Sequence, residues 1–201
     1  MMLEVEVLSR QQLLQSGAFR VVNVCFQYRR FDGSSTGPLE KLILGRGDSV
    51  ALLIHDVIHD KIVLVEQVRI ATIGSGSGWL EELPAGKVDP GESLIETTYR
   101  EAVEETGVAL QSIKLATSFY LSPSISSEKM HLFYCPIDEP FETSGYAGLQ
   151  SENEDIKVHL RTVDEALRLI EEGKICDAKT ILGLFWLARH QAELTQTEAH
   201  D

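Results

Sequence analysis

A segment rich in carboxylates, residues 86–108, reads GKVDPGESLIETTYREAVEETGV. Carboxylate oxygens are the ligands that hard divalent cations prefer in proteins. Side chains four residues apart lie on one face of an α-helix, so Glu101 and Glu105 could share such a cation. The backbone carbonyl of Ala85, just before the segment, could add a further oxygen. The pattern therefore predicts a divalent-cation site beside one face of a helix.

The helix that carries these residues is predicted to begin after Gly91 and to end at Gly107, which suits the left-handed position that closes many helices. Around a helical wheel one face is acidic, and the opposite face is apolar and is expected to pack on the core. The acidic face contains Glu101, Glu104 and Glu105, and the apolar face contains Ile95, Tyr99, Ala102 and Val103.

An acidic helix face has a simpler interpretation, which is a solvated surface on an ordinary packed helix. Glutamates in the last turn oppose the helix dipole, however, at a cost of about 0.3–1 kcal/mol each. Stability alone would not favour this cluster, and a positive partner is therefore expected beside it.

The composition of the chain limits the classes of partner. The 201 residues include 31 acidic and 18 basic ones, and the net charge is −13. This charge repels nucleic-acid phosphates and anionic membranes, so neither is expected as a partner. An anionic substrate would need cations between itself and the protein.

The cysteines and the N-terminal segment predict a cytoplasmic location. Cys25, Cys135 and Cys176 are an odd and widely spaced set without metal-ligand spacing, and we expect three buried, reduced thiols. The N-terminal residues do not resemble a secretory signal, and no stretch approaches the length of an apolar membrane span.

The order of strand-like and helix-like segments predicts an α+β fold, with helices on both sides of a central mixed sheet. Two β-rich runs, 20–31 and 39–44, predict an antiparallel unit over residues 1–47, and residues 48–201 then form the main domain. The strands predicted there are 49–56, 61–70, 79–84, 112–121, 129–137 and 155–161. The predicted helices are 93–106, 162–172 and 177–194.

Local sequence adds detail to the second half of the chain. Residues 162–165 read TVDE, the spacing of a capping box at a helix start. Residues 138–154 are acidic and aperiodic, which predicts a long functional loop. The last helix is expected to turn one face towards the core, formed by Ile181, Leu184, Phe185, Leu187 and Ala188.

Residues 86–108 match every fixed position of the Nudix box, G-x5-E-x7-R-E-U-x-E-E-x-G-U, where U is a bulky aliphatic residue and Ala102 is the one small choice. The chain thus resembles the Nudix hydrolases, over roughly residues 17–190. Further segments are similar to the ADP-ribose pyrophosphatase branch: VEQVR (65–69), ELPAG (82–86), SP (122–123) and SENEDI (151–156). The C-terminal EEGKICDAKTILGLFWL is similar to that branch and to its sister GDP-mannose pyrophosphatases.

The resemblance implies a Nudix α/β/α sandwich and a metal-dependent hydrolase of nucleoside diphosphates linked to another moiety. Two or three Mg²⁺ ions are implied, and Mn²⁺ can replace them. By motif position, the implied metal ligands are Glu101 and Glu105, assisted by Glu104, with the Ala85 carbonyl completing the set and Glu154 holding a further ion.

Other catalytic roles are also carried over by motif position. Arg100 and Glu92 are implied to orient the metal-binding carboxylates by hydrogen bonds. Glu152, in the loop 151–156, is implied as the general base that takes the proton of the attacking water. This loop is expected to close over the substrate.

The implied substrate is ADP-ribose, with AMP and ribose 5-phosphate as products, and GDP-mannose or another nucleotide sugar is the alternative. Arg69 is predicted to contact phosphate, and the other predicted substrate contacts are Glu82, Arg46, Glu128 and Pro123. Structural alternatives exist for several of them, because Glu82 could cap a turn and Arg46 could be an ordinary loop residue. Phe19 and Tyr28 could stack on a base or pack in a core.

Two departures from the branch bear on the choice of substrate. The branch usually has two glycines after the Ser-Pro pair, where this chain has Ser124-Ile125, and this loop therefore lacks glycine-only conformations. Basic residues often found near the base site are here Glu40 and Lys41. Both features concern recognition of the sugar and the base.

The resemblance also implies a homodimer, because the N-terminal strands of this branch exchange between two subunits and build part of each other's pocket. A non-catalytic Nudix-fold ligand sensor is disfavoured by the intact box. An RNA-processing role is disfavoured by the acidic charge and the absence of basic patches.

Overall fold

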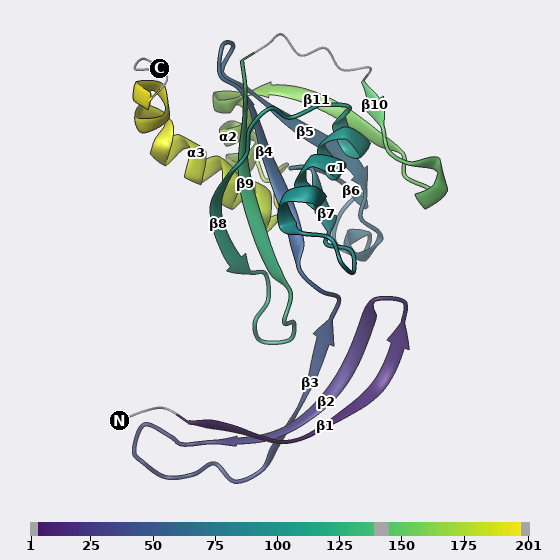
Figure 1. Ribbon diagram of the computed structural model, residues 1–201, viewed down its shortest axis with the longest axis vertical. Coiled ribbons are helices and arrows are strands. Elements are labelled where there is room, and N and C mark those ends of the chain that lie inside the picture. The colour runs from purple at the N-terminus through teal and green to yellow at the C-terminus, as the bar shows by residue number, and fades with distance from the viewer. Residues whose placement is uncertain (1–3, 139–144, 198–201) are drawn as a thin grey trace. The chain divides into compact units, whose positions relative to one another are not determined.

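The computed structural model describes residues 4–138 and 145–197. It divides into two units (Figure 1). The first unit comprises Met1–Asp48 and Tyr120–Lys129, and the second comprises Ser49–Phe119 and Met130–Asp201.

The first unit is built on an antiparallel sheet of β1 (Val5–Ser16), β2 (Phe19–Tyr28) and β3 (Leu39–Gly45), in that order. The runs predicted at 20–31 and 39–44 correspond to β2 and β3. Strand β1 was missed, because its polar middle, SRQQ, has no period-two apolar pattern. Residues 120–129 join this unit through β3, where the Leu44 amide donates to the Ile125 carbonyl at 2.8 Å.

The second unit is built on an eight-stranded mixed sheet with the main order β10-β11-β5-β4-β9-β8. Strands β4 and β9 run parallel, whereas β4–β5 and β5–β11 are antiparallel. The strands are β4 (Ser49–Asp56), β5 (Lys61–Val68), β6 (Trp79–Glu82), β7 (Ala85–Lys87), β8 (Lys114–Tyr120), β9 (Lys129–Ile137), β10 (Tyr146–Ala147) and β11 (Ile156–Thr162).

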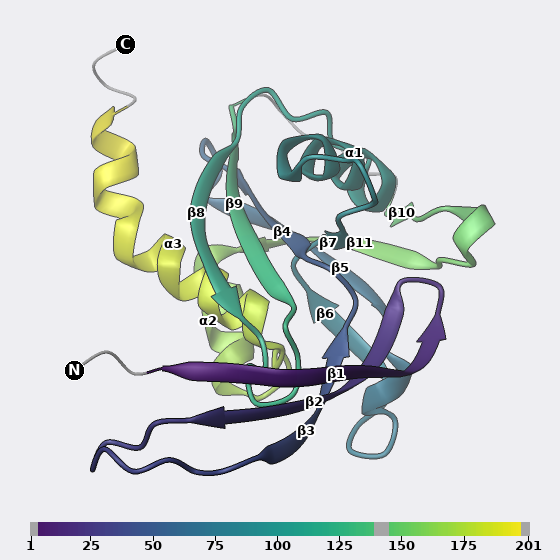
Figure 2. The same cartoon turned by 60° about the horizontal axis from the view of Figure 1, so that its bottom comes forward.

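Helices cover both faces of this sheet (Figures 1 and 2). Along β4 the side chains alternate between two cores, since neighbouring residues of a strand point to opposite faces. Leu52 packs in the core that contains Ala102 of α1 (Leu94–Thr106), and Leu53 packs in the core that contains Leu184 of α3 (Ala178–Thr197). Helix α2 (Val163–Glu171) contributes to the second core through Ala166. The predicted sandwich is confirmed.

Strands β4 and β5 diverge beyond their short pairing at His55–Ile62 and Asp56–Lys61. Residues 79–87 enter the opening: β6 pairs with β5, and β7 pairs with β4. At the crossing, the Leu52 amide donates to the Pro84 carbonyl at 2.9 Å. This crossing segment, residues 82–86, lies within the sheet rather than in a surface loop.

Several local predictions are confirmed. Gly107 closes α1 in the left-handed conformation, at φ +77°. Thr162 caps α2 with a complete capping box. A second capping box, in which Ser93 pairs with Glu96, starts α1 and was not noticed in the sequence, although its S-L-I-E spacing is present.

The predicted apolar face of α1 is wrong for Ile95, Tyr99 and Val103, whose exposed fractions are 55%, 36% and 55%. Ala102 is buried as expected. The helix instead buries a small and polar face, formed by Thr97, Thr98, Glu101, Ala102, Glu105 and Thr106. Hydrophobicity alone therefore predicted the wrong buried face for this helix.

Two further burial predictions are corrected. In α3, Phe185 and Ala188 are exposed, because Gly183 and Trp186 turn inwards beside Leu184 and Leu187. Of the three cysteines, Cys135 is buried, Cys25 is half-buried on an open sheet and Cys176 is exposed just before α3. All three are free thiols.

Candidate active site

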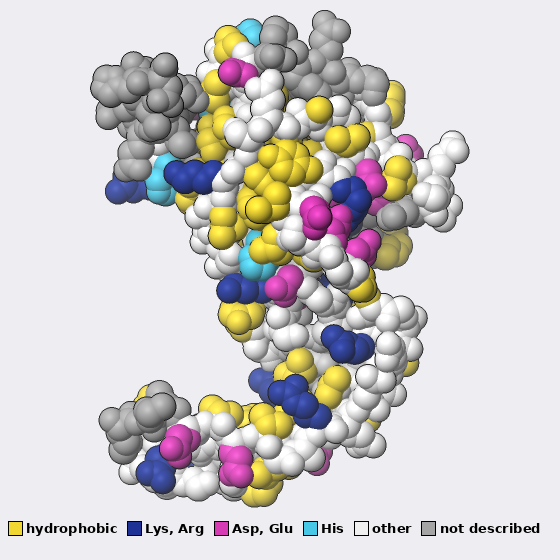
Figure 3. Space-filling view, viewed as in Figure 1, with side chains coloured by type: hydrophobic (Ala, Val, Ile, Leu, Met, Phe, Trp, Pro, Cys, Tyr) yellow, Lys and Arg dark blue, Asp and Glu magenta, His cyan; other side chains and the backbone are white. Residues whose placement is uncertain are grey.

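The acidic side of α1 faces the crossing segment closely, and a glycine makes this possible. A Cβ atom on Gly86 would lie 1.7 Å from Glu101 Oε1, far inside any real contact distance. The first glycine of the motif is thus required by the position of the Glu101 carboxylate. Figure 3 shows acidic side chains gathered over α1 with a basic side chain among them.

Glu105 is the most enclosed carboxylate of this cluster, with 3% of its surface exposed. Its Oε2 accepts a hydrogen bond of 2.7 Å from the Ala85 amide, and its Oε1 accepts one of 3.2 Å from Gln67 Nε2. Burial raises the pKa of Glu105 to about 8, although the Ala85 hydrogen bond opposes the shift. The site therefore holds a carboxylate that lacks a full positive counterpart.

Glu101 lies one helical turn earlier and is 8% exposed. Its Oε1 accepts a hydrogen bond of 2.8 Å from Arg100 Nη1. Burial raises the pKa of Glu101 to about 7, Arg100 opposes this, and the negative charges of Glu104 and Glu154 add to it. Like-charged neighbours thus surround the two buried glutamates.

Arg100 connects the carboxylates at the edge of the cluster. Its Nε and Nη2 donate to the two oxygens of Glu92, both at 3.0 Å, and its Nη1 donates to Glu104 Oε2 at 2.7 Å. The hydrogen bond from Arg100 holds the pKa of Glu92 at about 2, while the same partners raise the pKa of Arg100. The guanidinium is therefore fixed on several sides and orients Glu101 and Glu104.

The segment that contains the E-N-E-D motif lies against the end of α1. Predicted as a loop, it contains β10 and a short 3₁₀ turn, η2 (Gln150–Glu152). The Gly148 amide donates to the Glu104 carbonyl at 3.0 Å, and the Leu149 amide donates to Glu154 Oε2 at 3.3 Å. The Glu152 backbone lies in η2, and its side chain, like residues 139–144, falls outside the described part of the structure.

A second buried carboxylate, Glu82, lies at the start of the crossing segment and is 2% exposed. Its Oε1 accepts a hydrogen bond of 2.6 Å from Arg69 Nε, and its Oε2 accepts one from Lys179 Nζ. Lys179 Nζ also donates to Asp177 Oδ2 at 3.0 Å. Glu82 therefore bonds to two cations, an ion-pair role that the sequence did not predict for it.

The carboxylate oxygens near α1 are the candidate ligands for the implied divalent cation. Among residues 4–138 and 145–197, no three His, Cys, Asp or Glu side chains are gathered as a group that could hold a metal ion. The chemistry of the donors nevertheless fits a hard cation, because Glu101 and Glu105 are buried carboxylates and burial raises the pKa of both. A divalent cation would favour their charged form.

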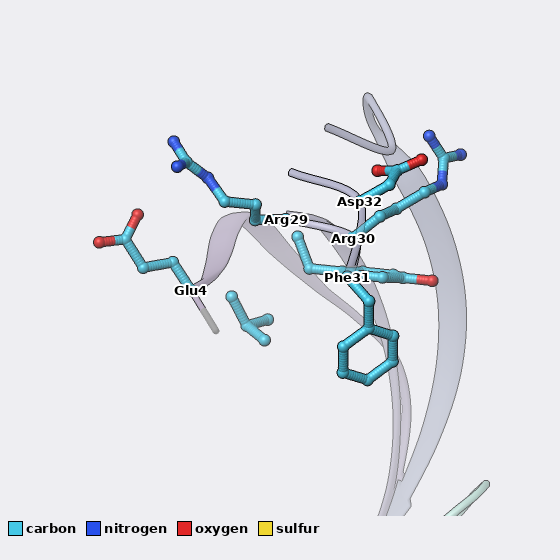
Figure 4. Close-up of a pocket in the computed structure, with 7 residues that line it drawn as sticks. Glu4, Arg29, Arg30, Phe31 and Asp32 are labelled. Atoms are coloured by element: carbon cyan, nitrogen blue, oxygen red, sulfur yellow. The ribbon is translucent and has the colours of Figure 1, made fainter. Parts of the chain in front are cut away.

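Other predicted site residues lie in the first unit. Arg46 Nε lies 3.5 Å from Glu128 Oε1, and Pro123 is on the exposed loop before Glu128. Phe19 and Tyr28 are each 40% exposed, so neither is a core residue. A hollow of about 540 Å³ in this unit is lined by residues 4–5 and 28–32. Figure 4 shows these side chains, none of which is a predicted catalytic residue.

The sequence did not single out three residues that the fold brings to the two carboxylate clusters. They are Gln67, which is two residues before Arg69 on β5, and Lys179 and Asp177, which belong to the α3 start. A signal for Lys179 was available, since it is the one lysine within the otherwise apolar stretch 178–188. Nothing in the spacing showed which carboxylate it would meet.

A search of family models matches the NUDIX domain over residues 45–198, which is most of the chain. The chain belongs to the Nudix family, as the fold and the box around α1 indicate.

Curated proteins similar to this chain include ADP-ribose pyrophosphatases and GDP-mannose pyrophosphatases. The chain is 36% identical to an ADP-ribose pyrophosphatase of Escherichia coli strain K12 over 192 residues, which cover 95% of this chain and 91% of that one. It is 34% identical to an ADP-ribose pyrophosphatase of Haemophilus influenzae, covering 96% and 90%, respectively. A GDP-mannose pyrophosphatase of Pectobacterium atrosepticum is 31% identical and covers 86% and 88%.

A solved structure shares the fold. The crystal structure of an ADP compounds hydrolase superposes with a TM-score of 0.71 at 19% identity and covers 94% of this chain and 96% of that one.

Within the described residues, no helix has the length and apolar character needed to cross a membrane.

Proposed function

We propose that this protein is a metal-dependent pyrophosphohydrolase that cleaves ADP-ribose into AMP and ribose 5-phosphate. The observation that carries the proposal is a pair of buried glutamates on one face of α1: Glu101, which packs against Gly86, and Glu105, whose hydrogen-bond donors, the Ala85 amide and Gln67, are neutral. The 36% identity to an ADP-ribose pyrophosphatase over nearly the whole chain supports the choice of substrate.

The metal would be held by Glu101 and Glu105, with Glu104, Glu154 and the Ala85 carbonyl as further oxygen donors. Two or three Mg²⁺ ions, or Mn²⁺ in their place, would neutralise the pyrophosphate and increase the electrophilicity of phosphorus. Their charge also explains how a protein of net charge −13 would bind an anionic substrate.

The chain's own residues would perform the remaining steps. Arg100, fixed by Glu92, orients the carboxylates of Glu101 and Glu104. Arg69 binds a substrate phosphate. Water adds its oxygen to one phosphorus and loses a proton to Glu152, and the bridging P–O bond breaks, so that the bridging oxygen leaves with the other phosphate.

The first unit would complete the substrate site in a homodimer. Support comes from β1, which is exposed along its whole length and carries Val5, Val7, Leu13 and Leu14 at 45–68% exposure. A sheet with so much apolar surface favours a protein partner. Arg46, Glu128 and Pro123 would contact the substrate, and Phe19 or Tyr28 would stack on the base. Light scattering should give twice the monomer mass at micromolar concentration, and a monomer would contradict the dimer.

GDP-mannose is the second candidate substrate, favoured by relatives that are 31% identical and by the altered loop at Ser124-Ile125. Separate hydrolysis assays with Mg²⁺, with product analysis by chromatography, decide between the two. AMP from ADP-ribose at a higher kcat/KM supports the first proposal, and GMP from GDP-mannose at a higher kcat/KM supports the second. Failure on both rejects each of them.

The free thiols support a reducing, cytoplasmic location.

A further inference from the structure

We propose that Lys179 is a positioning residue for this reaction, which holds Glu82 so that Arg69 presents both terminal guanidinium nitrogens to a substrate phosphate. The inference rests on the proposed function and deepens it. Lys179 lies in the first turn of α3, far in sequence from the Nudix box.

The Glu82 carboxylate divides its two oxygens between two cations. Oε1 accepts from Arg69 Nε at 2.6 Å, and Oε2 accepts from Lys179 Nζ. Both the carboxylate and the lysine are nearly enclosed, at 2% and 7% exposure. A buried carboxylate oxygen without a hydrogen-bond donor is energetically costly. Because Lys179 occupies Glu82 Oε2, Arg69 needs to donate only one of its nitrogens to Glu82.

Lys179 acts through Glu82 rather than on the substrate. Its ammonium donates to Asp177 Oδ2 at 3.0 Å as well as to Glu82, which directs it into the protein. The four side chains together are electrically neutral: Arg69 and Lys179 against Glu82 and Asp177. Its most exposed member is Arg69, whose side chain is 39% exposed, and on the buried side Asp177 Oδ1 has no hydrogen-bond partner among the described residues.

Arg69 is aligned for anion binding. Within the described residues, its Nε donates to Glu82, and no hydrogen bond is formed by Nη1 or Nη2. Gln67, two residues before Arg69, donates to Glu105 Oε1 at 3.2 Å, so the end of β5 lies beside the acidic cluster. Two parallel N–H donors match two oxygens of a phosphate.

Removing Lys179 should therefore change Arg69. Glu82 Oε2 would lose its cation and would recruit an Nη nitrogen of Arg69 into a bidentate pair. The guanidinium would then turn from the substrate towards Glu82. The predicted consequence is weaker substrate binding rather than a slower chemical step.

The test is steady-state hydrolysis of ADP-ribose with Mg²⁺ by wild type, K179M, K179R and R69Q. K179M should raise KM roughly 10- to 100-fold and change kcat by less than about 3-fold, since it weakens a charge-assisted contact. K179R, which keeps the positive charge, should restore KM to within about 3-fold of wild type. K174M is the matched control on an exposed lysine that pairs with Glu172, and it should behave as wild type.

A double variant separates positioning from a purely structural role. In an R69Q background K179M should raise KM no further, because Lys179 acts through Arg69. An equal KM rise in both backgrounds, or a loss confined to kcat, overturns the proposal. If K179M does not fold, K179Q keeps a donor for Glu82 and repeats the test. Failure of both to fold also overturns it, because the lysine would then be needed for the fold itself.

Failure of the proposed function can be recognised separately. If wild type hydrolyses neither ADP-ribose nor GDP-mannose, the proposed function is rejected. Calorimetric titration of inorganic pyrophosphate with Mg²⁺ then decides the role of Lys179. Weaker binding by both K179M and R69Q than by wild type supports it, whereas equal binding by K179M, or no binding by wild type, overturns it.

Discussion

Two buried carboxylate clusters lie at opposite ends of the crossing segment 82–86, and they differ in how their charge is balanced. Glu82 is bonded to Arg69 and Lys179, both supplied by the chain. Glu105 is bonded to the neutral donors of Ala85 and Gln67, and its pKa is raised to about 8.

This difference in charge balance suits Glu82 to stabilising the fold and Glu105 to binding a cation. A buried carboxylate with its own cations contributes to a fixed arrangement, and removing one partner leaves an unpaired charge. A buried carboxylate without them destabilises the metal-free protein and gains from any cation that binds. The same segment of chain thus supports a closed ion-pair network at one end and an open site at the other.

The largest expected effect comes from removing the open carboxylate. Glu105→Gln should lower kcat by about 10³-fold or more, because it deletes an oxygen that we propose to bind the metal. The thermal melt should stay within a few degrees or rise, because a buried charge is lost. E171Q, on an exposed glutamate at the end of α2, is the control that should leave both quantities unchanged. Retained activity in E105Q would remove Glu105 from the site.

The same substitution at the balanced carboxylate should have the opposite effect on folding. Glu82→Gln leaves Lys179 and Arg69 with reduced negative charge, so the free energy of unfolding should fall by about 3–5 kcal/mol. Urea denaturation of E82Q and E105Q, both without metal, measures the comparison. Equal shifts of the two urea midpoints would contradict the difference in charge balance between Glu82 and Glu105.

Gly86→Ala tests the close packing of the Glu101 carboxylate against the crossing segment. The added methyl would overlap the Glu101 carboxylate, so α1 or β7 must shift, at a cost of about 1–3 kcal/mol. Activity should fall at least 10-fold with it. G74A is the matched control, because nothing lies within 4 Å of its added Cβ and its backbone needs no positive φ. Wild-type activity in G86A would contradict the close packing of Glu101.

The stability of the metal-free protein should also depend on pH. The pKa values of Glu101 and Glu105 are raised from 4.5 to about 7 and about 8, so the folded state binds protons more tightly than the unfolded chain. Their contribution to stability is fully present below pH 4.5 and is lost as pH rises through the folded-state pKa values of about 7 and about 8, by about 1.4 kcal/mol per pH unit for each group. Glu92, with its pKa lowered to about 2, acts oppositely, but only below pH 4.5.

This dependence can be measured by melting the protein in a chelator at several pH values. The melting temperature should fall between pH 4.5 and pH 8, and the fall should be smaller in E105Q. Saturating Mg²⁺ should reduce the fall as well, since the ion favours the deprotonated carboxylates. A melting temperature that rises across this interval would contradict the raised pKa values.

Local sequence determined much of this protein. The spacing of residues 86–108 identified the family, Gly107 ended the helix, and the 162–165 capping box began another. The order of strand-like and helix-like segments was enough to predict a sheet covered on both faces. These features depend on neighbours within a few residues, which is why the sequence alone shows them.

Tertiary structure decided which charges are balanced. The wheel for α1 placed Tyr99 and Val103 inside, yet both are exposed, and the buried face of the helix instead sets Glu101 against Gly86 and Ala102 in the core. Glu82 and Lys179 are 97 residues apart in the chain, and only the packing of α3 on the sheet brings them together. Burial and ion pairing depend on what lies opposite a side chain in space, and spacing along the chain does not contain that information.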